Sequence, residues 1–223
     1  METRYHQTRF APEAKRDLLW SSLWRFYFSR IITDQDCVID LGCGYGNFIN
    51  HVKARRRIAV DEWGEFPNYI NPGVEAVVGS AIDVGFLEEG SVDFAFASNL
   101  FEHIPKADFT RFLVDFRPKL SERGTLNILQ PNYRYSFREY FDDFTHVSVY
   151  SHVSMCDLLA SAGYEVFECY PKFLPLTLKS RFPVSPYLIW LYLKMPVRPF
   201  GKQMFIRARC MSRRNDIRTR KQK

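Results

Sequence analysis

The chain has 223 residues, of which 46% are hydrophobic and 16% aromatic, so it can bury a substantial core, and intrinsic disorder is excluded for most of it. Five scattered cysteines without a C-x-x-C pair exclude a disulfide framework and a cysteine-rich zinc site. We find no secretory leader, and the longest uncharged apolar run near the end, 187–193, is too short to span a bilayer. We therefore expect a cytoplasmic protein.

The net charge of +6 is unevenly distributed along the chain. Residues 169–223 hold 14 of the 31 Lys and Arg residues and a single acid, Asp216, whereas the remainder is acidic overall. A basic stretch interleaved with aromatic residues and leucines suits an anionic surface such as phospholipid headgroups or nucleic acid, and it also suits a solvated end that keeps the protein soluble. We expect residues 211–223 to be disordered.

The hydrophobic pattern predicts strands and helices that alternate after an N-terminal helix over 16–32. Pro118 should tighten the last turn of the helix expected over 106–120, and Gly124 should end that helix. The alternation indicates a single α/β domain over 1–210, with a doubly wound, mostly parallel seven-stranded sheet that carries helices on both faces. The expected strands are 38–41, 57–60, 75–78, 92–97, 125–129, 165–169 and 203–208, and the expected helices are 48–54, 106–120 and 154–162.

The first of these strands runs into an acid and three alternating glycines, Val38-Ile39-Asp40-Leu41-Gly42-Cys43-Gly44-Tyr45-Gly46. Glycines let the backbone bend sharply and approach a ligand closely. The spacing differs from the G-x-G-x-x-G pattern of dinucleotide sites, and an acid before the glycines suits an ammonium or ribose hydroxyl better than a phosphate. Asp61 ends the second strand where an acid can accept both ribose hydroxyls, and Trp63 follows it in position to face an adenine.

The D-x-G-x-G-x-G pattern resembles motif I of the class I S-adenosylmethionine (SAM) methyltransferases. The stretch Ser98-Asn99-Leu100-Phe101-Glu102-His103-Ile104-Pro105 resembles the S-N-x-x-E-H-I-P signature of many small-molecule methyltransferases. The resemblance implies a Rossmann-like fold with SAM as cofactor, and a cofactor-binding core over 33–132. The residues that it assigns to the cofactor are Asp40, Gly42, Cys43, Gly44, Gly46, Asp61, Glu62, Ser80, Ala81, Asp83, Ser98, Asn99 and Leu100.

One part of the cofactor assignment stays open, because the sequence departs from the family after the third strand. These enzymes commonly have Gly-Asp-Ala there, whereas this chain has Gly79-Ser80-Ala81. The contact to the adenine amino group then falls to the Ser80 hydroxyl, the Ala81 backbone or Asp83. A turn-forming role explains Asp83 equally well.

An aromatic and acidic insertion over 130–151 follows the fifth strand, where loops carry acceptor specificity. Residues 98–182 resemble a bacterial methyltransferase branch associated with surface-polysaccharide biosynthesis, through motifs such as Gln130-Pro131-Asn132-Tyr133-Arg134-Tyr135 and Lys179-Ser180-Arg181-Phe182-Pro183. Phe141 and Thr145 depart from that pattern. The resemblance implies O-methylation of a small molecule or glycan, including a lipid-linked saccharide, with residues 133–202 as insertion and basic aromatic segment.

The candidate catalytic residues on the acceptor side are His146, His103 and Glu102. His103 has the chemistry to take a proton from a hydroxyl, but a Glu-His pair at a helix entrance is also a common capping and packing element. A structural histidine bonded to a carbonyl explains His146 as well. We predict no metal site, because His146, His152 and Cys156 have no carboxylate or second cysteine at ligand spacing and methyl transfer from a sulfonium needs no metal.

Two alternatives to a small-molecule enzyme follow from the basic C-terminal region. A nucleic-acid methyltransferase is disfavoured, because the N-P-P-Y-like loop after the fourth strand and a Pro-Cys nucleophile are both missing. A catalytically silent SAM-binding scaffold remains open. In either the scaffold or the enzyme, residues 172–223 could contact an anionic membrane at its inner face. The sequence predicts no oligomeric state.

Overall fold

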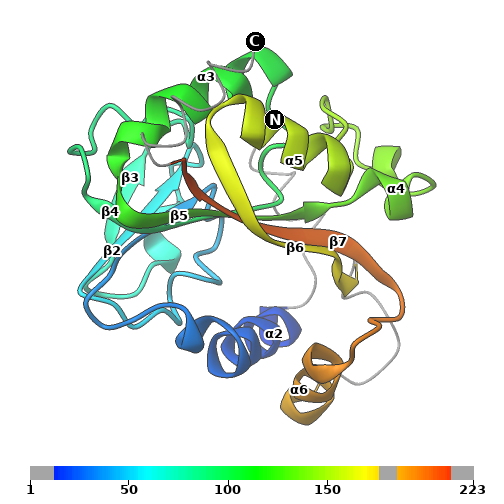
Figure 1. Cartoon of the computed structure of the whole chain (residues 1–223). Helices are drawn as coiled ribbons and strands as arrows, with labels where there is room; N and C mark the ends of the chain where they lie inside the picture. The colour runs from blue at the N-terminus through cyan, green and yellow to red at the C-terminus, as the bar shows by residue number, and fades with distance from the viewer. Residues whose placement is uncertain (1–12, 176–184, 212–223) are drawn as a thin grey trace.

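The computed structural model describes residues 13–175 and 185–211, and its centre is a seven-stranded sheet in the order β3-β2-β1-β4-β5-β7-β6 (Figure 1). The strands β1 (Cys37–Leu41), β2 (Arg56–Asp61), β3 (Glu75–Val78), β4 (Val92–Ser98) and β5 (Leu120–Pro131) pair in parallel. Strand β7 (Gly201–Cys210) inserts antiparallel between β5 and β6 (Tyr164–Pro175). The predicted doubly wound, mostly parallel sheet is therefore confirmed.

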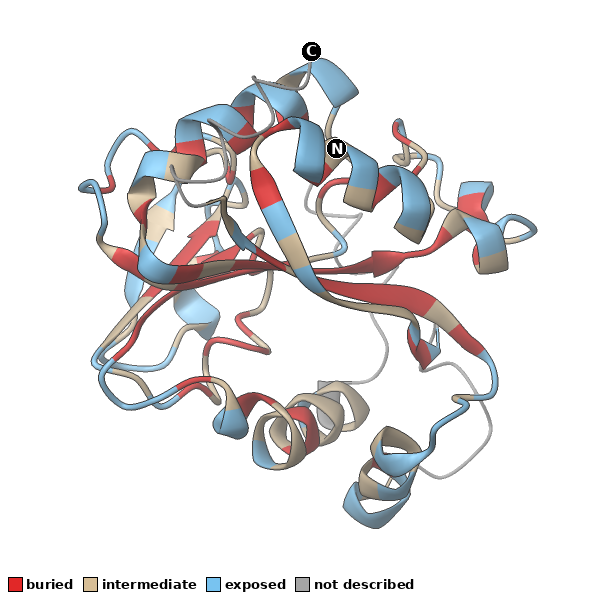
Figure 2. Ribbon diagram, viewed as in Figure 1, coloured by how far each residue is buried: buried red, intermediate tan, exposed pale blue. Residues whose placement is uncertain are grey.

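Helices cover both faces of the sheet, as the sequence pattern predicts. Helices α3 (Lys106–Phe116) and α5 (His152–Ser161) lie on one face, and α2 (Glu13–Phe26) and α6 (Pro186–Lys194) lie on the other (Figure 1). Buried residues concentrate along the strands and on the inner sides of the helices (Figure 2). The shorter elements are η1 (Phe28–Arg30), η2 (Phe66–Tyr69), η3 (Arg117–Lys119), η4 (Tyr140–Asp142) and α4 (Tyr133–Ser136).

The apolar spacing explains these layers. On α3, Phe109, Phe112 and Phe116 recur at three and four residues and are all buried against the sheet. On the opposite face, Phe28 contacts Phe48 and Phe96 edge-on, with ring centroids 5.0 and 5.3 Å apart. Each layer is therefore fastened by aromatic packing on the central strands.

The helix predicted over 48–54 is wrong. The segment consists of consecutive turns in which the His51 and Val52 amides bond three residues back, to the carbonyls of Phe48 and Ile49. The Asn50 side chain bonds to the loop over 69–71, because its amide donates to Tyr69 O at 2.8 Å and its oxygen accepts from Asn71 N at 2.9 Å. These bonds to a distant loop, which apolar periodicity does not encode, replace a regular helix.

The end of α3 confirms one expectation and corrects another. The helix stops at Phe116 and Pro118 lies in the 3-10 turn η3, as proline should tighten it. Gly124 does not stop the helix; it lies inside β5. A Cβ there would lie 2.5 Å from the carbonyl oxygen of Val92, where the register between β4 and β5 shifts. The glycine allows two backbones to approach closely.

Two expectations from the sequence concern segments that lie wholly or largely outside the described residues. Apart from Met211, the tail over 211–223 lies outside them, as does the Lys179–Pro183 motif. Within the described ranges, no helix has both the length and the apolar character needed to cross a membrane.

Candidate active site

The carboxyl ends of β1, β2 and β4 meet at one edge of the sheet, and the glycine turn follows β1 at that edge. Gly42, Gly44 and Gly46 all have left-handed backbones, with φ of 69°, 51° and 68°. A Cβ on Gly46 would lie 2.4 Å from Ile70 Cδ1, and one on Gly42 would lie 2.9 Å from Leu100 Cδ1. The turn therefore requires glycine for backbone conformation and for space.

Asp61 fastens the end of β2 to this turn. Its Oδ2 accepts from the Gly44 amide at 2.7 Å and its Oδ1 accepts from the Trp63 amide at 2.9 Å. Trp63 stacks on Tyr69 with centroids 5.2 Å apart, and Tyr45 meets both rings edge-on. Since each carboxylate oxygen offers two lone pairs, Asp61 keeps capacity to accept from ligand hydroxyls.

Asp40, at the end of β1, is only 3% exposed. Burial, and then the nearby charge of Asp61, raise its pKa to about 8. Burial, and then the charges of Asp40 and Asp61, raise the pKa of the Cys43 thiol, which packs in the core. Two neighbouring acids beside a glycine turn without Cβ atoms can accept hydrogen bonds, and they fit a ligand with a cationic amino group and ribose hydroxyls, as SAM has.

The end of β4 has a strained residue at the same edge. Asn99 has φ of 51°, which asparagine tolerates better than most side chains, and its amide donates to Leu129 O at 2.8 Å. Its Oδ1 accepts from Gln203 Nε2 at 2.9 Å, which links β4 to β7. Leu100 follows, against Gly42. Asn99 therefore fixes the direction in which the chain leaves the sheet between the cofactor-side and acceptor-side residues.

The remaining cofactor candidates differ in their surroundings. Ala81 is buried, Ser80 is half-buried, and Glu62 is exposed. Asp83 is exposed, and its Oδ1 accepts from the Gly85 amide at 3.2 Å in a local turn. This bond favours the turn-forming explanation of Asp83, so Ser80 and the Ala81 backbone are the better candidates for the adenine contact.

The three predicted acceptor-side residues come together in the structure. The backbone oxygen of Glu102 accepts from the amides of Val147 and Ser148 at 2.9 and 3.0 Å, which holds the insertion beside the β4 end. The rings of His103 and His146 lie with centroids 4.8 Å apart. Glu102 is fully buried, and burial raises the pKa of its carboxyl to about 8. This group of side chains is referred to below as the acceptor cluster.

Thr145 and Asp143 also belong to the acceptor cluster, and the sequence did not predict either as a site residue. Thr145 Oγ1 lies 2.9 Å from His103 Nδ1 and 2.6 Å from Asp143 Oδ1. Thr145, which departs from the family pattern, thus connects a carboxylate to the histidine. The local signal is the Asp-x-Thr spacing, because the Thr145 amide also donates to Asp143 Oδ1 at 3.1 Å in an Asx-type turn.

His152, by contrast, has a structural environment. Its Nδ1 lies 3.0 Å from Asn132 Nδ2, its ring stacks on Tyr135, and burial lowers its pKa. It lies at the start of α5, after the Ser151 cap. This histidine therefore serves as a matched reference for substitutions in the acceptor cluster.

Comparison with known proteins decides the family. A sequence profile described as a methyltransferase domain matches residues 9–168. The chain belongs to this methyltransferase family. No curated protein matches the sequence significantly. The methyltransferase does have many structural neighbours, and these are similar in fold at low sequence identity.

A SAM-dependent methyltransferase from Archaeoglobus fulgidus is 21% identical, with a TM-score of 0.63 over 93% of this chain and 98% of that one. An S-adenosylmethionine-dependent methyltransferase from Mesorhizobium loti is 14% identical, with a TM-score of 0.60 over 84% and 97%. Geranyl diphosphate C-methyltransferase from Streptomyces coelicolor, solved with Mg²⁺, geranyl diphosphate and S-adenosyl-L-homocysteine, is 14% identical, with a TM-score of 0.59 over 86% and 77%. Family and fold together make this chain a SAM-dependent methyltransferase.

Proposed function

We propose that the methyltransferase acts on a hydroxyl oxygen of a small molecule or glycan, a lipid-linked saccharide included. The observation that carries this proposal is the acceptor cluster, in which His103 is bonded to Thr145 and through it to Asp143, beside His146 and the buried Glu102. A hydroxyl acceptor must lose a proton during methyl transfer, and this cluster offers groups that can take one.

We also propose that SAM is held by the glycine turn, Asp40 and Asp61, with Ser98, Asn99 and Leu100 beneath its reactive end. When bound, SAM supplies a methyl group on a sulfonium. In that transfer the acceptor oxygen would bond to the methyl carbon, the sulfur would keep the electron pair of the broken carbon–sulfur bond, and the acceptor proton would leave to a base of the protein. Alignment of the oxygen and removal of the proton are therefore the tasks of the protein.

The hydrogen-bond directions favour His103 as a proton acceptor. An ionised Asp143 can only accept, so the Thr145 hydroxyl donates to it and accepts from His103 Nδ1. In the neutral imidazole the lone pair is then on Nε2. Asp143, acting through Thr145, would stabilise the positive charge that the ring gains with a proton.

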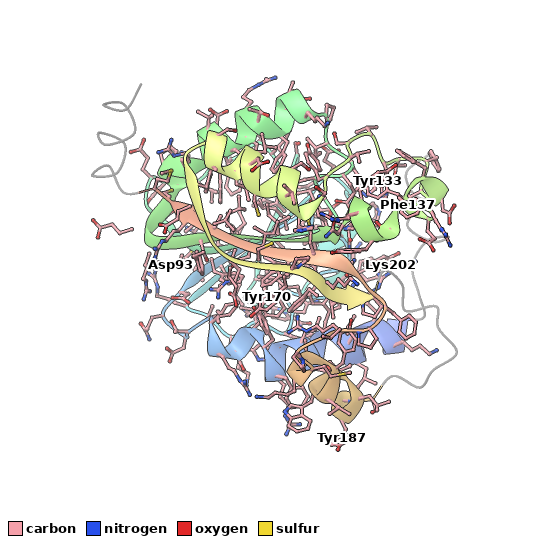
Figure 3. All side chains as sticks on the ribbon, turned by 45° about the vertical axis from the view of Figure 1, so that its right-hand side comes forward. Asp93, Tyr133, Phe137, Tyr170, Tyr187 and Lys202 are labelled. Atoms are coloured by element: carbon pink, nitrogen blue, oxygen red, sulfur yellow. The ribbon has the colours of Figure 1, made fainter. Side chains whose placement is uncertain are left out.

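The insertion offers surfaces that suit a sugar. Phe137 and Phe141 are 55% and 57% exposed on the insertion, and Tyr133 packs edge-on against the Phe141 ring. Tyr133 and Phe137 lie on the same side of the molecule as Lys202 (Figure 3). Exposed aromatic rings provide apolar faces for the C–H faces of sugar rings, which supports a glycan acceptor.

Contact with a membrane is a separate proposal, and the described cations give it less support than the sequence suggested. Lys202 pairs with Glu139 at 2.6 Å, Arg207 with Glu168 at 2.8 Å and Arg209 with Glu165 at 3.0 Å. Arg198 lies over the rings of Tyr170 and Phe173. Their charges are largely satisfied within the protein, so attraction to an anionic surface would rest on the remaining cations of this region.

The surface of α6 gives the membrane proposal its apolar part. Tyr187, Leu188 and Leu191 are 66%, 45% and 43% exposed, and Tyr187 points outward from the molecule (Figure 3). We expect co-sedimentation with vesicles that contain anionic phospholipid and loss of binding in Leu188→Glu/Leu191→Glu. No sedimentation with either neutral or anionic vesicles would contradict the proposal.

Methyl transfer from labelled SAM to panels of sugars, nucleotide sugars and polyprenyl-linked saccharides tests the acceptor proposal. We expect an ether-linked methyl on a hydroxylated acceptor and loss of at least about 100-fold in rate in His103→Ala. His152→Ala is the matched control and should retain activity. Transfer to RNA that weakens steeply with salt would favour the nucleic-acid alternative instead. SAM binding without transfer to any acceptor would favour the silent scaffold.

A further inference from the structure

The Glu102 carboxylate lies in the interior of the protein, beside the end of β4. It is fully buried, and neither Oε1 nor Oε2 has a hydrogen-bond partner among the described residues. A buried carboxylate without a partner is costly unless it neutralises itself or meets a cation. The fold nevertheless holds this residue firmly, through two backbone bonds from Val147 and Ser148 to its carbonyl oxygen.

Two imidazoles accompany this carboxylate. One ligand-capable atom from each of Glu102, His103 and His146 lies within 4.8 Å of the other two. Donor atoms bound at about 2.1 Å to one tetrahedral ion lie about 3.4 Å apart, so a side-chain adjustment of about 1 Å would close the group around an ion. His103 and Glu102 are adjacent at the β4 end, and His146 comes from the insertion, so the site forms only when the insertion is folded.

The surroundings of His103 match those of a metal ligand. A histidine that binds a metal through one ring nitrogen usually donates the other N–H to an oxygen, which fixes its tautomer and orientation. Here Nδ1 lies 2.9 Å from Thr145 Oγ1, which in turn lies 2.6 Å from Asp143 Oδ1. The directions of these bonds place the proton on Nδ1 and the lone pair on Nε2.

Although the sequence alone predicts no metal site, we propose from this grouping that Glu102, His103 and His146 form a binding site for one divalent transition-metal ion of the Zn²⁺, Fe²⁺, Mn²⁺ or Co²⁺ class. Two imidazoles and a carboxylate are a donor set that such ions accept, whereas Mg²⁺ and Ca²⁺ prefer oxygen ligands. Three protein ligands leave coordination positions open for water or a substrate oxygen. Thr145 and Asp143 act as positioning residues for His103.

The role of the ion rests on the proposed function, whereas its binding does not. Bound to the acceptor hydroxyl, the ion would lower the pKa of that hydroxyl and orient its oxygen. The proton would then leave to water or buffer, because both imidazoles would be engaged with the metal. This route replaces direct proton removal by His103 and keeps the O-methylation chemistry unchanged.

Titration of the full chain with Co²⁺ tests the site. The protein is prepared without a histidine tag, stripped with a chelator and followed by visible absorption, and Zn²⁺ is added as competitor. We expect one equivalent of Co²⁺ to give ligand-field bands that Zn²⁺ abolishes. Binding should weaken by at least tenfold in Glu102→Gln and His146→Asn, and by about tenfold in Thr145→Val.

His152→Ala and His51→Ala are the controls, because both histidines lie outside the acceptor cluster, and they should bind Co²⁺ as the wild type does. Circular dichroism and thermal melts establish that each variant is folded. Absence of bands with the folded wild type at millimolar Co²⁺, or equal binding by Glu102→Gln and His146→Asn, would overturn the proposal.

Methyl-transfer assays separate this inference from the proposed function. One-equivalent Co²⁺ binding that depends on Glu102 and His146, without methylation of any hydroxyl acceptor, would leave the metal site standing and overturn the proposed function. O-methylation by chelator-treated protein that binds no Co²⁺ would do the reverse.

Discussion

The cofactor side of the active site and the acceptor cluster are built in different ways. The cofactor side consists of one contiguous turn whose conformation depends on left-handed glycines, with Asp40 before it and Asp61 beside it. The acceptor cluster joins residues 102–103 to residues 143–146 through backbone bonds from the insertion. The first is a local device that a short motif can encode. The second is a tertiary assembly whose members are separated by about forty residues of sequence.

The largest effect should come from Asp40, which we expect to meet the cationic end of the cofactor. Because its pKa is raised to about 8, and a cation favours the ionised form, SAM affinity should rise with pH up to about pH 8 and fall by up to tenfold per unit below it. Asp40→Asn should bind about 100-fold more weakly and lose this pH dependence. Calorimetry in buffers of different ionisation enthalpy should detect about one proton released at pH 7.

An affinity that is flat from pH 6 to pH 8 in the wild type would contradict this role for Asp40. Asp83→Asn is the control, because its exposed carboxylate makes a local turn bond. It should change SAM affinity by less than about threefold.

Substitution of Thr145 should impair methyl transfer without changing cofactor binding. Thr145→Val removes the hydroxyl between His103 and Asp143, and we expect the rate of methyl transfer to fall by about 10- to 100-fold with SAM affinity unchanged. Single-turnover kinetics at saturating SAM measures this rate. Thr145→Ser keeps the hydroxyl and should restore most of it. Equal losses in the Val and Ser variants would show that packing, rather than the hydroxyl, matters at this position.

A smaller, graded effect is expected in the glycine turn. Gly46→Ala should lower the free energy of unfolding by about 2–3 kcal/mol, because its Cβ would overlap Ile70 Cδ1 and its φ is 68°. Gly44→Ala meets no atom within 4 Å and should cost about 1 kcal/mol, from φ alone. Urea unfolding measures both. Equal costs would mean that the side chain of Ile70 moves aside without penalty.

The smallest effect should come from Asn99. Asn99→Ala places an ordinary side chain at φ of 51° and removes the bond from Gln203, so we expect a cost of about 1 kcal/mol. Asn99→Gly removes the same bond without backbone strain and should be nearly neutral in urea unfolding. If Asn99→Gly lowers the free energy of unfolding as much as Asn99→Ala does, the lost hydrogen bond from Gln203, rather than backbone strain, accounts for the cost.

The sequence predicted most of the fold, because alternating strands and aromatic periodicity in α3 are local properties. The helix over 48–54 was predicted wrongly because Asn50 bonds to the Tyr69–Asn71 loop, which no periodicity reports. The positions of Glu102, His103 and His146 near the acceptor were a family-based expectation. Their grouping with Thr145 depends on the pairing of Glu102 with residues 147 and 148, which only the folded chain reveals.

Calorimetric titration with SAM of the wild type, Asp61→Ala and His146→Ala tests most directly that the two sides of this edge are separate parts of one active site. We predict micromolar binding to the wild type, at least tenfold weaker binding to Asp61→Ala, and binding within about threefold of the wild type for His146→Ala. No binding to the folded wild type, or equal losses in the two variants, would contradict the account.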